Sequence, residues 1–397
     1  MNAKQVLSKC LTLVTPLMHK IRRQSLFSAI ESSMNGSSLS ITGLGRNIDG
    51  KAMEKHKIKR VDRLCSNAHL HRDIEFIYSR MAYLLVGTMK QPIIHIDWSD
   101  LDERKQHFLI RASLAAQGRS LTLYEEIHPL SKKDKPKTHR LFMTKLKAML
   151  PSDCKPIIVT DAGFRIPWFE LVQSLNWDYV GRFRNRTRCK KRSDSHWYPV
   201  KDLYVQANSR AKWLGDFLLR KHAPFQSRLV LFKRTTKGRK DKTAIGDKAR
   251  KSKQSRDNAE REKEPWLLAT SLCISSNTAK RIIKIYATRM QIEESFRDVK
   301  TGLKMNDSGS RIASRLSVLL LVACLSQFVL YLLGLAVKAA NKHRQYQANS
   351  IKHRNVLSNQ FIGLRAYKDR KLKLLRLHWR TAIKTLQGLI LEPQACY

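Results

Sequence analysis

A run of 21 residues without a charged side chain, Ser317–Val337, limits the folds open to this chain. Such a run is long enough to cross a bilayer as a helix, but a helix that is apolar all round can also form the centre of a large domain. Ser326 and Gln327 lie in its middle, and no second run of this kind occurs in the 397 residues. We therefore expect a buried core helix and no membrane partner, with a single membrane anchor as the alternative.

The rest of the chain carries a large excess of positive charge. Lys and Arg total 76 against 32 Asp and Glu, a formal net charge of +44, while apolar residues make up 42%. That apolar content is enough for folded cores, and the charge indicates a polyanion partner, first of all nucleic acid. A ribosome-associated or basic structural protein is the alternative reading of the charge.

The cysteine pattern and the N-terminus bear on the compartment. The seven cysteines are odd in number and include no C-x-x-C pair, which disfavours a disulfide framework and favours a reducing cytoplasm. Lys9 interrupts the apolar N-terminal stretch, so we expect no signal peptide.

Helical periodicity dominates residues 1–85 and returns in residues 278–340 and 341–397. In the first region, a short helix, a turn at Asp49-Gly50 and a second helix predict a helix-turn-helix that contacts DNA. A solvated basic face is the alternative. The second helix carries five basic residues: Lys55, Lys57, Lys59, Arg60 and Arg63.

The central residues change character. Residues 86–165 contain short apolar runs at 91–98, 107–115, 120–127 and 155–161, with a helical pattern at 138–150, which predicts a mixed α/β sheet. Residues 166–277 hold several further strand-like pieces and read as a β-rich insertion. Within them, residues 233–264 are rich in charge and free of aromatic residues, and we expect a mobile basic loop there.

Two acidic residues, Asp97 and Asp161, each close one of the apolar runs. If the two strands are neighbours, both carboxylates lie at one edge of the sheet. Paired carboxylates repel each other unless something neutralises them, and a divalent cation with oxygen ligands does so. A turn Asp after a strand is the ordinary alternative at each position.

The segment from Tyr286 to Lys300 supplies a third acidic residue. At 100° per residue, Tyr286, Arg289, Glu293 and Lys300 fall within about 60° of one another on a single helix face. An acid, two bases and a tyrosine on one face are unusual for a simple amphipathic helix. The ordinary alternative is an i,i+4 salt bridge between Arg289 and Glu293 on a solvated helix.

These residues together resemble a known family. Asp97, Asp161 and Glu293 are similar to the acidic triad of DDE transposases with an RNase H-like catalytic core. The spacing Tyr-x2-Arg-x3-Glu-x6-Lys, from Tyr286 to Lys300, resembles the signature of the IS4 family (Tn10/Tn5-like) of bacterial insertion-sequence transposases. The blocks 161–168 and 177–182 resemble the same family around its second Asp. The resemblance implies an RNase H-like core of mixed sheet flanked by helices, interrupted by a β-rich insertion.

The resemblance also implies function. It implies cut-and-paste transposition through nicking, hairpin formation and opening, and strand transfer, with two Mg²⁺ ions, or Mn²⁺ in their place, held by Asp97, Asp161 and Glu293. Tyr286, Arg289 and Lys300 would contact DNA near the active site, and Trp266 matches the residue that stacks on a flipped base in the family. A core Trp is the alternative for Trp266.

The implied partners are double-stranded DNA, as terminal inverted repeats and target, and a second copy of the chain in a synaptic homodimer. The implied location is the bacterial cytoplasm, associated with the nucleoid. Competing classes are a DNA-binding repressor without enzymatic activity, the membrane-anchored protein already mentioned, and another RNase H-like nuclease such as a resolvase.

Overall fold

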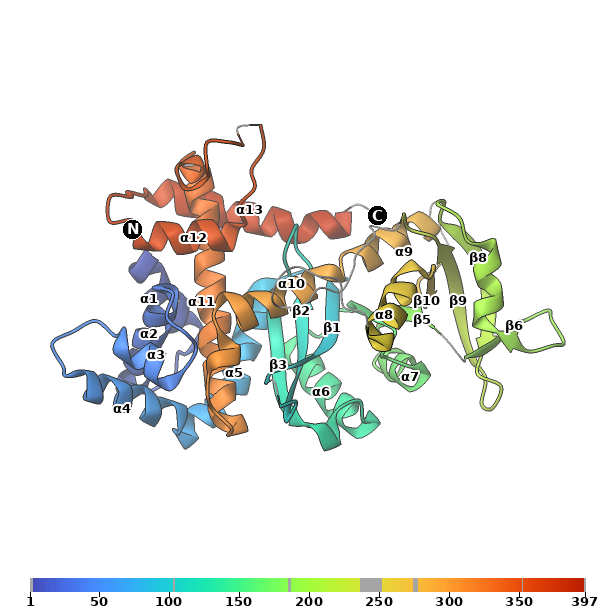
Figure 1. Ribbon diagram of the computed structural model, residues 1–397, viewed down its shortest axis with the longest axis horizontal. Helices are drawn as coiled ribbons and strands as arrows, with labels where there is room; N and C mark the ends of the chain where they lie inside the picture. Colours follow the sequence, from blue (N-terminus) through green and yellow to red (C-terminus); the bar gives the residue numbers. More distant parts are fainter. Residues whose placement is uncertain are drawn as a thin grey trace. The chain divides into compact units, whose positions relative to one another are not determined.

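The structure, a computed structural model, describes residues 3–102, 104–184, 187–235, 252–273, 278–351 and 353–395. The chain divides into two compact units, each of which we describe by itself. Unit 1 comprises Met1–Cys154 and Met290–Cys396, and unit 2 comprises Lys155–Arg289. Both combine helices with strands, so the fold is α/β, consistent with an RNase H-like core (Figure 1).

Unit 1 combines an antiparallel three-stranded ladder, in the order β3-β2-β1, with helices from both ends of the chain. The strands are β1 (Ile93–Asp100), β2 (His107–Leu114) and β3 (Leu121–Pro129). Its described helices are α1 (Ala3–Val14), α2 (Lys20–Met34), α3 (Ile41–Arg46), α4 (Glu54–Cys65), α5 (Ala68–Val86), α6 (Pro136–Met149), α10 (Met290–Arg297), α11 (Ala313–Ala339), α12 (Asn359–Lys368) and α13 (Arg376–Ala395).

Unit 2 contains a mixed sheet in the order β4-β5-β10-β9-β8-β6-β7, in which β4 and β5 are parallel and the other pairs antiparallel. The strands are β4 (Ile157–Thr160), β5 (Asp178–Phe183), β6 (Arg188–Lys191), β7 (Tyr198–Pro199), β8 (Lys212–Leu219), β9 (Phe225–Phe232) and β10 (Trp266–Thr270). The described helices of this unit are α7 (Ile166–Ser174), α8 (Lys253–Lys263) and α9 (Thr278–Ala287).

The uncharged run lies in α11, the long helix at the centre of unit 1, and the expectation of a buried core helix is confirmed. α2, α12, α13 and β3 all pack against it. The Ser326 hydroxyl donates to the Val322 carbonyl at 2.6 Å, so this buried polar group is satisfied within the helix. By length and composition the helix could cross a membrane, but its apolar surface is already covered by protein.

Two glycines allow α11 and α12 to approach closely. A Cβ atom built on Gly334 of α11 would lie 1.8 Å from the Asn359 carbonyl oxygen, and one built on Gly363 of α12 would lie 1.9 Å from the Leu330 carbonyl oxygen. Each glycine therefore faces the backbone of the opposite helix. The Ser358 hydroxyl accepts a hydrogen bond from the Phe361 N–H at 3.2 Å and caps the start of α12 beside this contact.

The predicted helix-turn-helix has the expected elements. The Ser40 hydroxyl caps α3 by accepting from the Gly43 N–H at 2.9 Å, a turn containing Asp49 and Gly50 follows, and α4 begins at Glu54. A Cβ on Gly45 would lie 2.5 Å from the Ile58 Cα, so the two helices meet backbone to backbone. Three of the five basic residues of α4, Lys55, Lys59 and Arg63, are exposed.

The segment 233–264, expected to be a mobile loop, departs from that expectation. Lys253–Lys263 form α8, which begins where the Ser255 N–H donates to the Ser252 hydroxyl at 3.2 Å. This N-cap and an i,i+3 ion pair between Lys263 and Glu260, 3.7 Å apart, stabilise the helix locally. The prediction of a loop rested on the high charge and the lack of aromatic residues, which do not reveal such local contacts. Residues 236–251 of the predicted loop lie outside the described residues.

Replacing either contact glycine tests the α11–α12 packing. Gly334→Ala raises intrinsic helix propensity by about 1 kcal/mol, yet we expect a net loss of about 1–3 kcal/mol in unfolding free energy because the helices must separate. Gly388→Ala in α13 is the matched control, since nothing lies within 4 Å of its Cβ position. Urea denaturation measures both, and a Gly334→Ala protein as stable as Gly388→Ala would contradict the packing argument.

Candidate active site

Asp97 lies where β1 emerges from the core of unit 1. The strand is fully buried from Ile93 to Ile96, half-buried from Asp97 to Ser99 and exposed at Asp100. One carboxylate oxygen of Asp97 accepts a hydrogen bond from the Trp98 N–H at 2.8 Å. The side chain is thus oriented by its own backbone at the point where the strand becomes accessible.

A row of charged residues crosses the three strands at the level of Asp97. Asp97 of β1 is the Cα partner of Arg111 on β2, and Arg111 is the Cα partner of Glu125 on β3. Directly opposed residues share a face of the sheet, so the three side chains lie on one face. Arg111 and Glu125 are both buried, and the guanidinium contacts one Glu125 carboxylate oxygen at 2.6 and 2.7 Å.

Arg111 also holds α10, the helix that carries Glu293. Its guanidinium donates to the Ser295 hydroxyl at 2.8 Å and lies 4.8 Å from the centre of the Phe296 ring. At the other end of the row, the Tyr78 hydroxyl of α5 donates to Glu125 at 2.7 Å, and burial raises the pKa of Tyr78 well above its usual value, so it stays a donor. Within unit 1, α10 also packs against β1. Glu293 lies two residues before Ser295 on this helix and is half-buried.

Asp161 belongs to unit 2 and directly follows the buried strand β4. One of its carboxylate oxygens accepts a hydrogen bond from the Gly163 N–H at 2.8 Å. A Cβ at Gly163 would approach that oxygen to 3.0 Å, which suits a glycine at this position. Like Asp97, Asp161 is half-buried and oriented by a backbone N–H.

Three of the predicted DNA-contacting residues gather in unit 2 near Asp161. The rings of Trp266 and Tyr286 meet edge to face with centroids 4.9 Å apart, and the Arg289 guanidinium lies 5.9 Å from the Tyr286 ring centre. Burial raises the pKa of the Tyr286 hydroxyl, and the nearby Asp161 carboxylate raises it further. Arg234, which the sequence gave no reason to select, lies 5.8 Å from the Trp266 ring centre.

The single helix face predicted for residues 286–300 is wrong. α9 ends at Ala287, and the N–H groups of Thr288 and Arg289 bond three residues back instead of four. The Thr288 hydroxyl also donates to the Ile285 carbonyl at 2.6 Å, which ends the helix by competing with its ladder. α10 starts at Met290, and the boundary between the two units falls between these helices.

Lys300 departs from the prediction as well. It lies in a π-helical turn, Asp298–Gly302, where the 100° spacing does not hold. Its ammonium group forms an ion pair with Asp100 at 2.9 Å and holds the pKa of that carboxyl below its usual value, against the effect of burial. Asp100, at the end of β1, is therefore part of the neighbourhood that sequence reasoning missed.

The basic residues predicted on α4 divide into two groups. Lys55, Lys59 and Arg63 are exposed, whereas Lys57 and Arg60 are half-buried. Arg60 donates to the Ser25 hydroxyl of α2 at 3.2 Å, and Lys59 pairs with Asp62 at 2.8 Å. Arg60 thus also has a packing role within unit 1.

A hollow in unit 2, beginning next to Asp161 at Ala162, was not predicted. Two of its lining residues, Arg184 and Lys201, pair with Glu264 at 3.2 and 3.7 Å, and burial lowers the pKa of Arg182. The repeated Arg residues in segment 182–188 are the signal in the sequence that could have indicated it. The cations along the hollow are Arg165, Arg182, Arg184, Arg188, Lys201, Arg220 and Lys221.

The three acidic candidates offer carboxylate oxygens, the ligand type that hard divalent cations prefer. Unit 1 contains Asp97 and Glu293, and unit 2 contains Asp161. In the described part of the chain, no three His, Cys, Asp or Glu side chains are gathered into a ready-made metal site. The donor chemistry and the backbone-oriented carboxylates of Asp97 and Asp161 nevertheless fit a divalent ion.

Breaking the charged row should destabilise unit 1. Glu125→Leu leaves the Arg111 guanidinium buried without its carboxylate, and we expect a loss of about 3–5 kcal/mol in unfolding free energy. The triple variant Arg111→Met, Glu125→Leu, Tyr78→Phe removes the buried ion pair together with the hydroxyl that donates to it and should recover most of the loss. Denaturant titration measures both, and a triple variant no more stable than Glu125→Leu would argue against this explanation.

Comparison with known proteins gives the family of the chain. A search of curated proteins finds no match. The family model described as "Transposase DDE domain" matches residues 88–328, which include β1 with Asp97, β4 followed by Asp161, and α10 with Glu293. Enzymes with this domain are metal-dependent transposases that act on DNA. Because the match covers more than half of the chain, this protein belongs to the family of DDE transposases.

Proposed function

We propose that this DDE transposase moves a bacterial insertion sequence of the IS4 kind by cut-and-paste transposition. The observation that carries the proposal is the contact of Trp266 with Tyr286, since it joins the proposed base-stacking residue to the first residue of the Tyr-Arg-Glu-Lys signature. Asp161 lies close enough to Tyr286 to affect the pKa of its hydroxyl. A base-stacking residue near a proposed catalytic carboxylate suits an enzyme that distorts the DNA end it cuts.

Asp97, Asp161 and Glu293 are the proposed holders of two Mg²⁺ ions, with Mn²⁺ able to replace them. Each of the three would supply carboxylate oxygens, which such ions prefer as ligands. When bound, such ions activate a water or 3′-hydroxyl nucleophile and stabilise the leaving oxygen of an in-line displacement. The hydrogen bonds from the Trp98 and Gly163 N–H groups keep the two aspartates oriented.

The neighbouring side chains position DNA. Arg289 and Lys300 neutralise phosphates near the scissile bond, and the Tyr286 hydroxyl, kept protonated by its burial, donates to a phosphate oxygen. Lys300 is held near this position by Asp100. Trp266 is half-buried, so part of its ring stays accessible for an unpaired base, whose stacking offsets part of the cost of flipping at the hairpin stage.

The remaining parts of the proposal concern larger assemblies. The exposed Lys55, Lys59 and Arg63 of α4 contact the terminal inverted repeat. Two copies of the chain synapse two element ends before strand transfer to target DNA. The reaction takes place at the nucleoid in the bacterial cytoplasm.

Substituting the proposed metal ligands tests the chemistry. Asp161→Asn and Glu293→Gln remove a negative charge with little change in volume, so end-specific DNA binding should persist while Mg²⁺-dependent nicking falls below detection. Electrophoretic mobility shift and nicking of a duplex carrying the element end measure the two properties. Full nicking by either variant would rule out its assigned role. Nicking and hydrolysis without any strand transfer by the wild-type protein would favour a resolvase-like nuclease instead.

Substituting Trp266 tests the hairpin step. Trp266→Ala should leave the first nick intact and reduce hairpin formation, because the flipped base loses stacking worth about 1–3 kcal/mol, or about five- to more than a hundredfold. Trp266→Phe keeps an aromatic face and should retain most of the hairpin yield. Denaturing gel analysis of a labelled end separates nicked from hairpin product. An equal hairpin yield for wild type and Trp266→Ala would assign Trp266 to packing only.

A further inference from the structure

The helix that carries Glu293 does not end as an ordinary α-helix. α10 passes directly into the π-helical turn Asp298–Gly302, in which the Leu303 N–H bonds to the Asp298 carbonyl at 2.9 Å, five residues back. Such turns are rare and occur mostly singly, often at functional sites. The register of this turn decides where Lys300 lies. Contacts from outside the helix are therefore needed to hold it.

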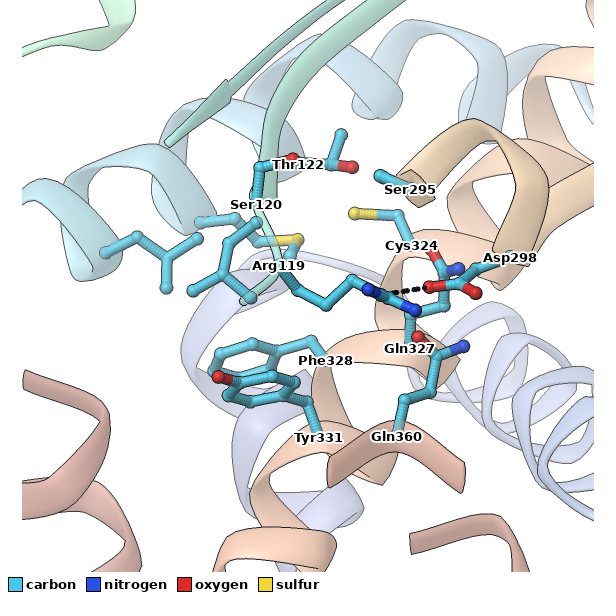
Figure 2. A pocket seen from close by; sticks show the side chains of 13 residues that line it. Arg119, Ser120, Thr122, Ser295, Asp298, Cys324, Gln327, Phe328, Tyr331 and Gln360 are labelled. Atoms are coloured by element: carbon cyan, nitrogen blue, oxygen red, sulfur yellow. Dashed lines mark hydrogen bonds and ion pairs between the residues drawn. The ribbon is translucent and has the colours of Figure 1, made fainter. Parts of the chain in front are cut away.

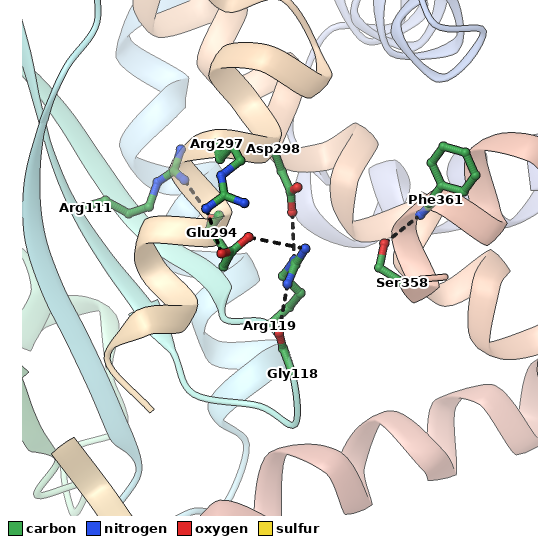
Figure 3. A network of polar contacts seen from close by, with 9 residues as sticks. Arg111, Gly118, Arg119, Glu294, Arg297, Asp298, Ser358 and Phe361 are labelled. Carbon is green, nitrogen blue, oxygen red and sulfur yellow. Dashed lines mark hydrogen bonds and ion pairs between the residues drawn. The ribbon is translucent and has the colours of Figure 1, made fainter. Parts of the chain in front are cut away.

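Arg119 provides these contacts from the β2–β3 connection. Its Nε donates to Asp298 Oδ2 at 3.0 Å, its Nη2 lies 3.7 Å from Glu294 Oε2, and its Nη1 donates to the Gly118 carbonyl at 3.1 Å (Figure 3). Glu294 lies in the last turn of α10, and Asp298 is the first residue of the π-turn. One guanidinium therefore spans the point at which the helix changes its hydrogen-bonding pattern.

The environment of this ion pair gives it more weight than a surface salt bridge. The side chains of Arg119, Asp298 and Glu294 are only 24–28% exposed. Arg119 and Asp298 border a cavity of about 30 Å³, which Ser295, Gln327 and Tyr331 also line (Figure 2). Its volume is about that of one water molecule. Because close packing is incomplete there, the charged contacts of Arg119 help to stabilise the π-helical turn on this side.

The turn connects Arg119 to the active-site neighbourhood. Beyond Asp298, Lys300 reaches Asp100 at the end of β1, three residues after Asp97, with a separation of 2.9 Å. Arg111 also holds α10, through its hydrogen bond to Ser295. α10 is thus fixed at two places, by a buried arginine near its middle and by Arg119 at its end.

We propose that Arg119 is a positioning residue for the transposase: it fixes the π-turn, and through it the placement of Lys300 and Glu293. The inference rests on the proposed metal-binding role of Glu293. Arg119 itself touches neither metal nor DNA in this proposal. Unlike Arg111, it is partly exposed, so its loss should leave the fold intact.

The test compares Arg119→Ala, Arg119→Lys and Asp298→Asn with the control Arg297→Ala. Arg297 also pairs with Glu294, at 2.8 Å, but it is 66% exposed and belongs to α10 itself, so it does not tie the helix to the β2–β3 connection. The first readout is Mn²⁺ binding to the protein–DNA complex, which is measured from the electron paramagnetic resonance signal of the Mn²⁺ that stays free. The second is the Mg²⁺ concentration at half-maximal nicking, and thermal unfolding reports the fold.

We expect Arg119→Ala and Asp298→Asn to weaken Mn²⁺ binding and raise the half-saturating Mg²⁺ concentration about 10–100-fold, the range typical of residues that orient metal ligands. Arg119→Lys should recover part of the loss, and Arg297→Ala should match wild type. Unchanged Mn²⁺ binding and Mg²⁺ requirement in a folded Arg119→Ala would overturn the proposal, as would an equal effect of Arg297→Ala. If the Arg119→Ala protein does not fold, the same two measurements on Asp298→Asn test the proposal, and unchanged values would overturn it. If the wild-type protein–DNA complex binds no Mn²⁺, the proposed metal-binding role of Glu293, on which this inference rests, is wrong instead.

Discussion

The buried ion pair between Arg111 and Glu125 is the interaction on which the organisation of unit 1 depends. Removing two charges from water costs several kcal/mol per ion, so the pair is tolerable only where further hydrogen bonds complete it. Tyr78 and Ser295 provide those bonds, and Phe296 covers the guanidinium. Four elements, α5, α10, β2 and β3, thus meet at one charged centre whose geometry permits little variation. Asp97, the Cα partner of Arg111, lies in register with it.

The proposed catalytic residues have separate supports in the two units. In unit 1, strand register orients Asp97, and the contacts of Arg111 and Arg119 with α10 hold Glu293 and Lys300. In unit 2, the turn after β4 orients Asp161, while an aromatic contact joins Trp266 to Tyr286. The chain passes from one set to the other between Arg289 and Met290. The Tyr-Arg-Glu-Lys signature is therefore a continuous sequence pattern divided between two structural units.

Local sequence patterns predicted the local features and missed those that depend on distant partners. The strands ending near Asp97 and Asp161 and the buried helix α11 followed from apolar runs, because burial leaves a direct mark on composition. The break after Ala287 did not, because a single Thr hydroxyl and a change in hydrogen-bond register decide it. Arg111 was overlooked although a charged residue inside an apolar strand is rarely buried without a partner. That partner, Glu125, could be assigned only once the register of β2 and β3 was known.

The excess of bases gives the few acidic residues two different roles. Glu125, Asp298, Asp100 and Glu264 pair with Arg or Lys side chains and hold basic segments in place. Asp97 and Asp161 receive hydrogen bonds from the N–H groups of Trp98 and Gly163, which orient their carboxylates. In a chain of net charge +44 the many cations attract DNA, and we propose that these two oriented acids serve the divalent cation.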